Sequence, residues 1–332
     1  MLLDVEDLSV AFATDTGLLH AVNGVSFQLD AGESLGLVGE SGCGKSTLGF
    51  ALMRLLADNG GITGGAVRLD SEDVVQMSEE RLRAVRWDKI AMVFQNAMSA
   101  LSPVARIGDQ IVNAMRLHKP VSRERALELA GDTFERVGVS RTRLQQYPHE
   151  FSGGMKQRAM LALGLVCGPQ LLIADEPTTA LDVVAQRQVL DLFRDLRRER
   201  GLALIMISHD ISAVSEICDK VAVMYGGEIM EFGPLREVFF NYRHPYTWAL
   251  INSFPSLHQP LRELVALPGA PPALADPPSA CPFVSRCPHA VGICSARRPP
   301  VVEVSAGHSV RCHRTDEIAL APVNRGSDGP AR

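Results

Sequence analysis

The stretch GESGCGKST, residues 39–47, decides the fold. It fits the pattern G-x-x-x-x-G-K-[ST], between an apolar run, SLGLV (34–38), and a segment of helical character, STLGFALMRLL (46–56). Glycines let successive backbone N–H groups point at phosphate oxygens, and the amino end of a helix adds positive charge there. The alternative is a glycine-rich turn with a surface lysine. The flanking strand and helix favour a phosphate-binding loop in an α/β fold.

Each residue type in this loop has a chemical role to fill. We expect Lys45 to reach the β- and γ-phosphates of ATP and the Ser46 hydroxyl to bind Mg²⁺. The remaining residues that we expect around the phosphates are Gly39, Ser41, Gly42, Cys43, Gly44 and Thr47.

A second chemical element ends the apolar run LLIADEP (171–177). Parallel strands bring their carboxyl ends to one edge of a sheet, so this run and SLGLV would end near each other. Asp175 would hold hydrated Mg²⁺, and Glu176 would polarise the attacking water. The alternative is that both carboxylates only cap the helix that follows.

Strand and helix patterns alternate from the start of the chain to about residue 240. LLDVEDLSVAF, AVNGVSFQL and LALIMISHD (202–210) are typical of strands. Residues 122–139 and 183–201 have helical periodicity, with Ser122 as a predicted N-cap and Gly201 as a predicted stop. Six prolines in 267–282 predict a semi-rigid linker.

Composition excludes several classes of protein. The chain has 332 residues, 46% hydrophobic and 21% charged, with a net charge of −5. This balance argues against nucleic acid as a partner. We find no secretory signal and no apolar run near the ~18 residues that cross a bilayer. Any membrane-spanning helices would therefore come from other chains.

A set of short motifs in a fixed order points to one family. EFSGGMKQR (150–158) carries an S-G-G stretch that general phosphate-loop ATPases lack, and the chain here resembles the ATP-binding cassette (ABC) family. The other matching elements are Phe12, Gln95 in VFQN, Ala180-Leu181-Asp182 and His209 in ISHD.

The resemblance to ABC proteins implies a role for each of these elements. Phe12 would stack on adenine, His209 would contact the γ-phosphate and the attacking water, and Asp182 would lie in the D-loop beside the nucleotide. Gln95 would sense Mg²⁺ and relay to membrane subunits. Ser152, Gly153 and Gly154, at a helix amino end, would close on ATP bound by a partner cassette, so that two cassettes form a head-to-tail dimer.

Longer stretches narrow the resemblance. YPHEFSGGMKQR, MYGGEIMEFGP and RHPYTWALINSFP (243–255) resemble the ATP-binding subunits of bacterial oligopeptide/dipeptide importers. This resemblance implies two transmembrane permease subunits, an extracytoplasmic peptide-binding protein, a second and different ATPase subunit, and a peripheral position on the cytoplasmic face of the membrane. One departure is Asn96-Ala97, where the subfamily usually has an acidic residue and a proline, in a region that adjoins the permease.

The resemblance leaves the cargo open. Nickel chelates or glutathione are alternatives to peptides. A non-transport ABC ATPase is a rival function, as is an iron–sulfur regulatory protein that binds ATP without turnover; Glu176 and His209 together speak against the latter.

Four of the seven cysteines follow the linker. Cys281, Cys287, Cys294 and Cys312 are spaced C-x5-C-x6-C-x17-C. Four thiolates can hold a [4Fe–4S] cluster or a structural zinc ion, and no C-x(2–4)-C pair typical of zinc occurs here. The resemblance to peptide importers implies the [4Fe–4S] cluster; zinc, free thiols or disulfides remain alternatives. The segment has few large apolar residues, which favours a structural role for a cluster over redox or iron sensing.

These observations predict an α/β fold with several parts. We expect a phosphate-loop (RecA-like) ABC nucleotide-binding domain with antiparallel β and helical subdomains, and a small irregular C-terminal metal-cluster domain. The predicted boundaries are 1–242 for the ATPase domain, about 96–165 for its helical subdomain, 243–320 for the C-terminal extension and 321–332 for a flexible tail.

Overall fold

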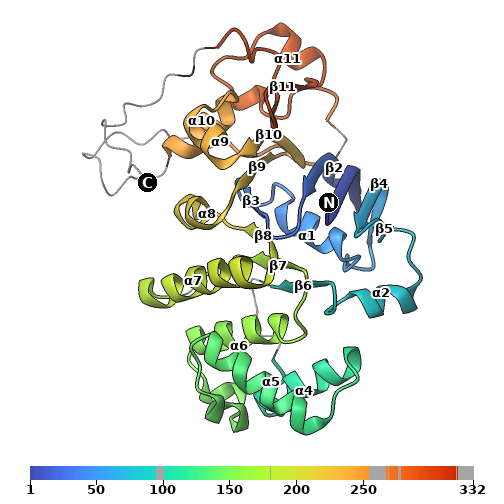
Figure 1. Ribbon diagram of the computed structural model, residues 1–332. Helices are drawn as coiled ribbons and strands as arrows, with labels where there is room; N and C mark the ends of the chain where they lie inside the picture. The colour runs from blue at the N-terminus through green and yellow to red at the C-terminus, as the bar shows by residue number, and fades with distance from the viewer. Residues whose placement is uncertain are drawn as a thin grey trace.

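The computed structural model describes residues 1–94, 101–179, 181–253, 267, 269–275, 278–318 and 320. The predicted flexible tail lies outside these residues, as do Gln95 and Ala180. Figure 1 shows a central sheet, a small sheet beside it, a group of helices at one end and the C-terminal extension at the other.

The central sheet has eight strands in the order β11-β12-β10-β9-β3-β8-β7-β6. The five adjacent strands β9, β3, β8, β7 and β6 are parallel to one another. Every residue of β3 (Ser34–Val38), β7 (Leu171–Asp175) and β8 (Ala203–Ile207) is buried. Parallel strands covered on both faces have continuous apolar sequences, which is why these runs were recognisable. The other parallel strands are β6 (Ile90–Val93) and β9 (Lys220–Tyr225).

The second sheet is antiparallel, in the order β2-β1-β4-β5. Its strands are β1 (Leu3–Thr14), β2 (Gly17–Leu29), β4 (Gly60–Leu69) and β5 (Glu72–Asp73). The predicted strands at the start of the chain are therefore confirmed. Their apolar side chains share one buried core with α1 (Lys45–Leu52) and with one face of the central sheet.

Up to residue 253, the described part of the chain has six helices outside the helical group of residues 107–165. They are α1 (Lys45–Leu52), α2 (Glu79–Val85), α7 (Val183–Arg200), α8 (Ile211–Ile217), α9 (Leu235–Phe240) and α10 (Pro245–Asn252). Of these, α1, α7, α8 and α9 each follow a strand of the central sheet. Gly201 ends α7 in the left-handed conformation, φ 63°, as predicted. Helix α1 ends four residues earlier than the sequence predicted, because Arg54 takes a left-handed φ of 49°.

A separate group of helices, in green at the bottom of Figure 1, occupies residues 107–165. It contains α4 (Ile107–His118), α5 (Arg123–Arg136), α6 (Gly153–Leu165) and the short 3₁₀ turns Arg141–Gln145 and Pro148–Glu150. Ser122 caps α5 as predicted, because its hydroxyl accepts a hydrogen bond from the Arg125 amide at 3.2 Å.

The C-terminal extension packs against the central sheet. It contributes β11 (Val301–Ser305) and β12 (His308–Arg311), and β12 pairs with β10 (Glu228–Pro234). Its other elements are the 3₁₀ turn η3 (Val284–Arg286) and α11 (Gly292–Ala296). Phe283 is fully buried in the hydrophobic core that the central sheet shares with the helical group. The expected small irregular unit is thus partly regular, and two of its strands extend the central sheet.

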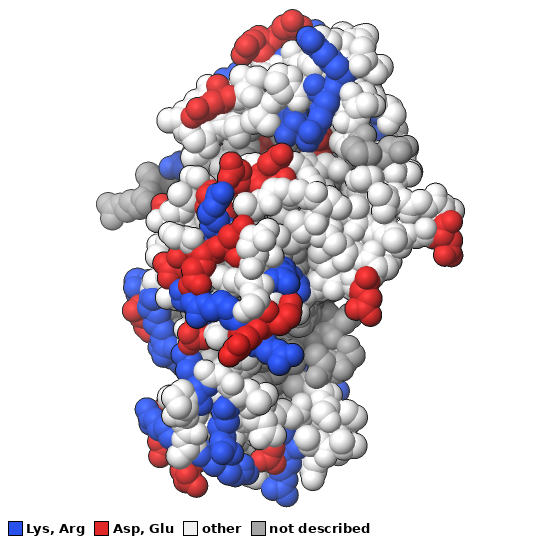
Figure 2. All heavy atoms as spheres, turned by 90° about the vertical axis from the view of Figure 1, so that its right-hand side faces the viewer, with Lys and Arg blue, Asp and Glu red and all other residues white. Residues whose placement is uncertain are grey.

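No helix within the described ranges is both long enough and apolar enough to cross a membrane. On the face seen in Figure 2, lysine and arginine side chains are interspersed with aspartate and glutamate. Ion pairs between exposed side chains are numerous, for example Arg187 with Asp191 and Glu216. Such pairs contribute little to stability individually.

Candidate active site

The phosphate loop lies between β3 and α1, and its shape requires glycine. A Cβ atom on Gly39 would lie 2.2 Å from the Met224 carbonyl oxygen, and one on Gly44 would lie 2.3 Å from the Ala21 carbonyl oxygen. Both glycines also have positive φ, 149° and 102°. The buried Lys45 ammonium lies inside the loop and donates to the carbonyl oxygens of Gly39 and Glu40, each at 2.8 Å. A cation is thus fixed where the backbone amides can receive an anion.

Asp175 ends β7 and is buried. Burial raises the pKa of this carboxyl, and a hydrogen bond with Ser46 at the start of α1 partly opposes that shift. In the part of the chain that the structure describes, the buried Oδ1 atom of Asp175 has no hydrogen-bond partner. A buried acceptor without a donor is costly, and a hydrated cation beside Ser46 and Asp175 would satisfy it. These two residues therefore fit Mg²⁺.

Glu176 is held by three contacts in a left-handed conformation, φ 49°. Its amide donates to the Ile207 carbonyl of β8 at 2.8 Å, its Oε2 accepts from the Thr179 hydroxyl at 2.7 Å, and its Oε1 lies 2.9 Å from His209 Nδ1. Burial would raise the pKa of Glu176, but the hydrogen bonds from His209 and Thr179 outweigh it, and the pKa is lowered. The carboxylate is therefore a fixed, ionised acceptor that can orient a water molecule.

The suggestion that Asp175 and Glu176 only cap the next helix is wrong. Asp182 caps α7, because its Oδ1 accepts from the Ala185 amide at 2.8 Å. The structure thus gives Asp182 a local role that the sequence had not assigned to it.

His209 lies beside the phosphate loop as well as beside Glu176. A cavity of about 190 Å³ is lined by Gly39, Glu40, Ser41 and His209, among others. The His209 side chain is 62% exposed. The predicted phosphate, magnesium and water-activating residues therefore share the carboxyl edge of the parallel strands, with His209 open to solvent.

The S-G-G stretch opens α6 in the helical group. Ser152 caps this helix by accepting from the Met155 amide at 3.3 Å, and Ser152 and Gly153 are exposed. A Cβ atom on Gly154 would lie 3.3 Å from Leu181 Cδ2, so the start of α6 adjoins the segment that precedes α7. Ser152 makes no described hydrogen bond to this chain's own phosphate loop, which suits a surface for a second molecule.

Phe12 lies on β1 of the second sheet, whereas Asp175 ends β7 of the central sheet. Its ring packs closely on Gly60 of β4, where an added Cβ would lie 2.4 Å from the ring. The ring is half-buried at the margin of the core.

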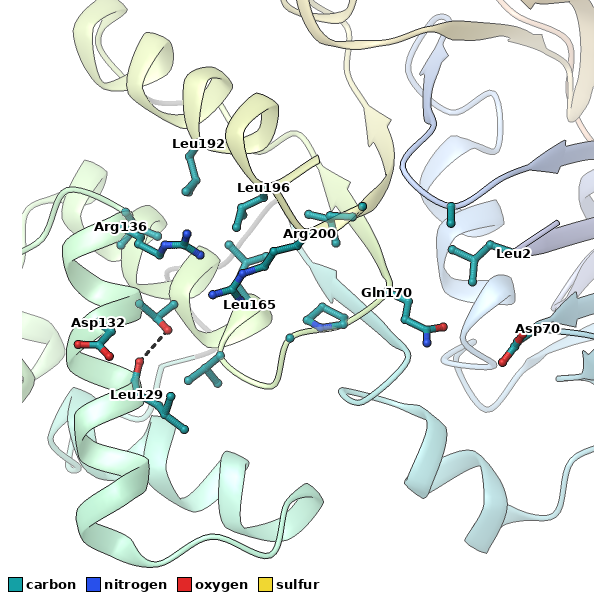
Figure 3. Close-up of a pocket in the computed structure, with 18 of the residues that line it drawn as sticks. Leu2, Asp70, Leu129, Asp132, Arg136, Leu165, Gln170, Leu192, Leu196 and Arg200 are labelled. Atoms are coloured by element: carbon teal, nitrogen blue, oxygen red, sulfur yellow. Dashed lines mark hydrogen bonds between the residues drawn. The ribbon is translucent and has the colours of Figure 1, made fainter. Parts of the chain in front are cut away.

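A cavity of about 790 Å³ lies at the opposite edge of the sheet from the phosphate loop. Its lining includes Gln170, Leu202 and Ala31, which precede β7, β8 and β3 respectively. Figure 3 shows leucine side chains of α6 and α7 facing it, together with Arg136 of α5 and Arg200 of α7. This cavity is therefore separate from the residues that would bind ATP.

The four cysteines of the extension converge. Cys281, Cys287, Cys294 and Cys312 line one small cavity, together with His244, His289 and Ile318 among others. Burial raises the pKa of the Cys281 thiol to about 12, and it also raises the pKa values of Cys287 and Cys312. Among the described residues, no three His, Cys, Asp or Glu side chains lie close enough to enclose a single metal ion.

Sequence reasoning missed Thr179, Tyr246 and Arg286. Thr179 follows the DEP triplet and helps to hold Glu176. Tyr246 and Arg286 belong to the extension and contact Glu40 of the phosphate loop. The sequence shows Arg286 next to Cys287, but this does not identify Glu40 as the partner of Arg286.

Comparisons with known proteins agree with this geometry. Residues 22–179 match the ABC transporter family, and residues 230–294 match the oligopeptide/dipeptide transporter C-terminal region. The chain is 47% identical over 322 residues to the oligopeptide transport ATP-binding protein OppD of Salmonella typhimurium, covering 96% of each. It is 41% identical to the dipeptide transport ATP-binding protein DppD of Bacillus subtilis, covering 98% of each.

Solved structures share the fold. The ABC transporter cassette MJ0796 superimposes with a TM-score of 0.65 at 24% identity, covering 70% of this chain and 99% of that one. The cbiO1 protein of Clostridium perfringens, part of an ABC transporter complex, gives a TM-score of 0.61 at 27% identity, covering 73% and 92%. The chain belongs to the ABC transporter family, among the ATP-binding proteins of oligopeptide/dipeptide transporters.

Proposed function

We propose that this chain hydrolyses ATP to drive the uptake of oligopeptides or dipeptides through a membrane complex. The observation that carries the chemistry is the Glu176 carboxylate, kept ionised by Thr179 and His209, next to the unsatisfied oxygen of Asp175. The relatives named for oligopeptide and dipeptide transport support the cargo class. The same machinery importing nickel chelates or glutathione is the second candidate.

Each residue of the site has a part in this reaction. Lys45 and the loop amides bind the phosphates, and Ser46 with Asp175 hold Mg²⁺, which neutralises phosphate charge when bound. Glu176 orients the attacking water and accepts its proton, and His209 steadies that carboxylate and reaches toward the γ-phosphate. Phe12 faces the adenine. Gln95, which lies outside the described residues, is assigned to Mg²⁺ and to communication with the membrane subunits.

The exposed start of α6 supports a partner cassette. Ser152, Gly153 and Gly154 supply helix amide groups to ATP held by a second, different ATPase subunit, and Asp182 lies near the same interface. Two permease subunits and an extracytoplasmic peptide-binding protein complete the complex. The chain then sits peripherally on the cytoplasmic face of the membrane.

Replacement of the proposed base tests the reaction. Glu176→Gln keeps the shape but removes the proton acceptor, so kcat should fall by about 10²–10⁴-fold, the usual contribution of general-base catalysis. ATP binding, measured by titration with a fluorescent ATP analogue, should persist. ATP turnover at the wild-type rate in the assembled complex would show that Glu176 is not the base.

We further propose that the four cysteines hold a [4Fe–4S] cluster that stabilises the extension. Around zinc all sulfurs bind one ion at about 2.3 Å, which puts them within about 4 Å of one another. In a cluster each sulfur binds its own iron, so wider spacing around a shared cavity suits it better. The four cysteines line one shared cavity, which is the arrangement that the proposed cluster requires.

Anaerobic purification with iron, sulfide and zinc analysis tests the cluster. We expect about four irons per chain, since each of the four thiolates binds one iron of the cube. Cys287→Ser should lower the iron content and the melting temperature. Cys167→Ser, which removes a thiol outside this cavity, should leave the iron content unchanged. Stoichiometric zinc without iron would contradict the proposal.

A further inference from the structure

A buried arginine of the cysteine segment contacts the phosphate loop. Arg286 directly precedes Cys287, and its side chain is only 4% exposed. Its Nη1 and Nη2 atoms donate to Oε2 and Oε1 of Glu40 at 2.7 and 3.0 Å. Glu40 is the second residue of the loop GESGCGKST. The pair is therefore a bidentate link between two segments about 250 residues apart, the strongest hydrogen-bonding geometry available to arginine and carboxylate.

Arg286 is itself held in place. Its Nη1 also donates to the Tyr225 hydroxyl at 3.1 Å, and its Nη2 to the Leu267 carbonyl oxygen at 3.3 Å. The guanidinium carbon lies 5.7 Å from the centre of the Tyr225 ring. Tyr225 is the last residue of β9, which pairs with β3, the strand that leads into the phosphate loop. The arginine therefore has little freedom to move away from Glu40.

The backbone of Glu40 is fixed from the same side of the molecule. Its amide donates to the Tyr246 hydroxyl of α10 at 2.9 Å. Tyr246 is fully buried, and its ring packs on those of Tyr225 and Phe283. The C-terminal extension thus holds both the amide and the carboxylate of one phosphate-loop residue.

This position matters for an anion-binding loop. The Glu40 carbonyl oxygen is one of the two that hold the Lys45 ammonium. An unpaired Glu40 carboxylate would add negative charge to a loop that must receive a triphosphate. Arg286 offsets that charge, and a loop already fixed in one conformation loses less entropy when ATP binds.

We propose that Arg286 is a positioning residue through which the cysteine-bearing extension neutralises and orients Glu40, and so sets the affinity of the phosphate loop for ATP. The inference rests on the proposed function only in taking this loop as the ATP site. By reciprocity of binding free energies, ATP stabilises the segment around Arg286 to the same extent that this segment favours ATP.

Nucleotide affinity of the full-length chain tests the role of Arg286. In Mg²⁺-containing buffer, Arg286→Gln should raise the Kd of a fluorescent ATP analogue by about fivefold or more, the lower range of couplings between sites. Arg286→Lys keeps the positive charge but cannot form the bidentate hydrogen bonds. Its Kd should therefore lie between those of Arg286→Gln and the wild type. In the double variant Glu40→Gln/Arg286→Gln the unpaired charge is gone, so its affinity should exceed that of Arg286→Gln alone.

A matched control separates positioning from stability. Arg298 also joins the extension to the ATPase domain, through an ion pair with the buried Glu228 and a hydrogen bond to the Asn23 carbonyl oxygen. Arg298→Gln should lower the melting temperature without changing the Kd for the ATP analogue. Arg286→Gln with wild-type affinity, or a double variant no better than Arg286→Gln, would overturn the proposal. If Arg286→Gln does not fold, Arg286→Lys carries the same comparison.

Hydrogen exchange gives the reciprocal readout. The ATP analogue should slow amide exchange across residues 283–290 in the wild type, and markedly less in Arg286→Gln. Equal protection in both proteins would also overturn the proposal. A wild type that does not bind the analogue at all would instead contradict the proposed function, so the two failures can be told apart.

Discussion

At the scale of single residues, Glu176 is the most constrained position of the site. A left-handed φ in a residue other than glycine costs of order 1 kcal/mol or more. Three contacts maintain it, from the Ile207 carbonyl, the Thr179 hydroxyl and His209. This backbone strain is consistent with a carboxylate whose orientation is needed for catalysis, even though it lowers the stability of the fold.

The Thr179 hydroxyl should set the acid limit of activity. Its hydrogen bond favours the ionised form of Glu176 and helps to lower the pKa of that carboxyl. Thr179→Val removes the bond while keeping the side-chain shape, so the pKa of Glu176 rises. The base then becomes protonated at a higher pH, and the acidic limb of the kcat–pH profile should move to higher pH.

Thr179→Ser is the control. It keeps the hydroxyl, so the acidic limb of its kcat–pH profile should lie at the same pH as in the wild type. Thr179 is exposed, so neither variant should alter the melting temperature much. An acidic limb unmoved in Thr179→Val would mean that Thr179 does not influence the ionisation of the base.

At the scale of elements, the sequence predicted what local patterns encode. Buried parallel strands such as β7 and β8 appear as continuous apolar runs. Ser122 marks the start of a helix by the hydrogen bond of its hydroxyl, and Gly201 marks the end of one by its left-handed backbone. The phosphate loop was recognisable because its glycines are required by close backbone contacts, as at Gly39.

Long-range pairings were not predictable from such patterns. Nothing in the sequence of β12 indicates that it pairs with β10 and extends the central sheet. Likewise, Arg286 carries no local signal for Glu40, because a contact between residues far apart depends on how the intervening elements pack. The sequence therefore predicted which residues gather around the phosphate loop, whereas it did not predict the structural link between the extension and that loop.

At the scale of the whole molecule, the proposed ATP site is divided between two surfaces. The phosphate loop, Asp175 and Glu176 lie at the carboxyl edge of the central sheet, whereas the exposed Ser152 and Gly153 begin α6 in the helical group. The exposed amino end of a helix can offer backbone amide groups to an anion that is bound to another molecule. In the proposed head-to-tail dimer, this end of α6 would complete the ATP site of a second cassette.

Blocking this surface should prevent association without affecting ATP binding by the same chain. In a Glu176→Gln background, which retains ATP, Ser152→Arg should abolish the ATP-dependent association of the chain with its partner cassette, measured by light scattering after gel filtration. The matched control is Ser122→Arg, because Ser122 is also an exposed N-cap serine of the helical group. Both variants lose a cap worth about 1 kcal/mol, so the loss of stability cancels in the comparison. Equal association of the two variants would mean that the start of α6 does not face a partner.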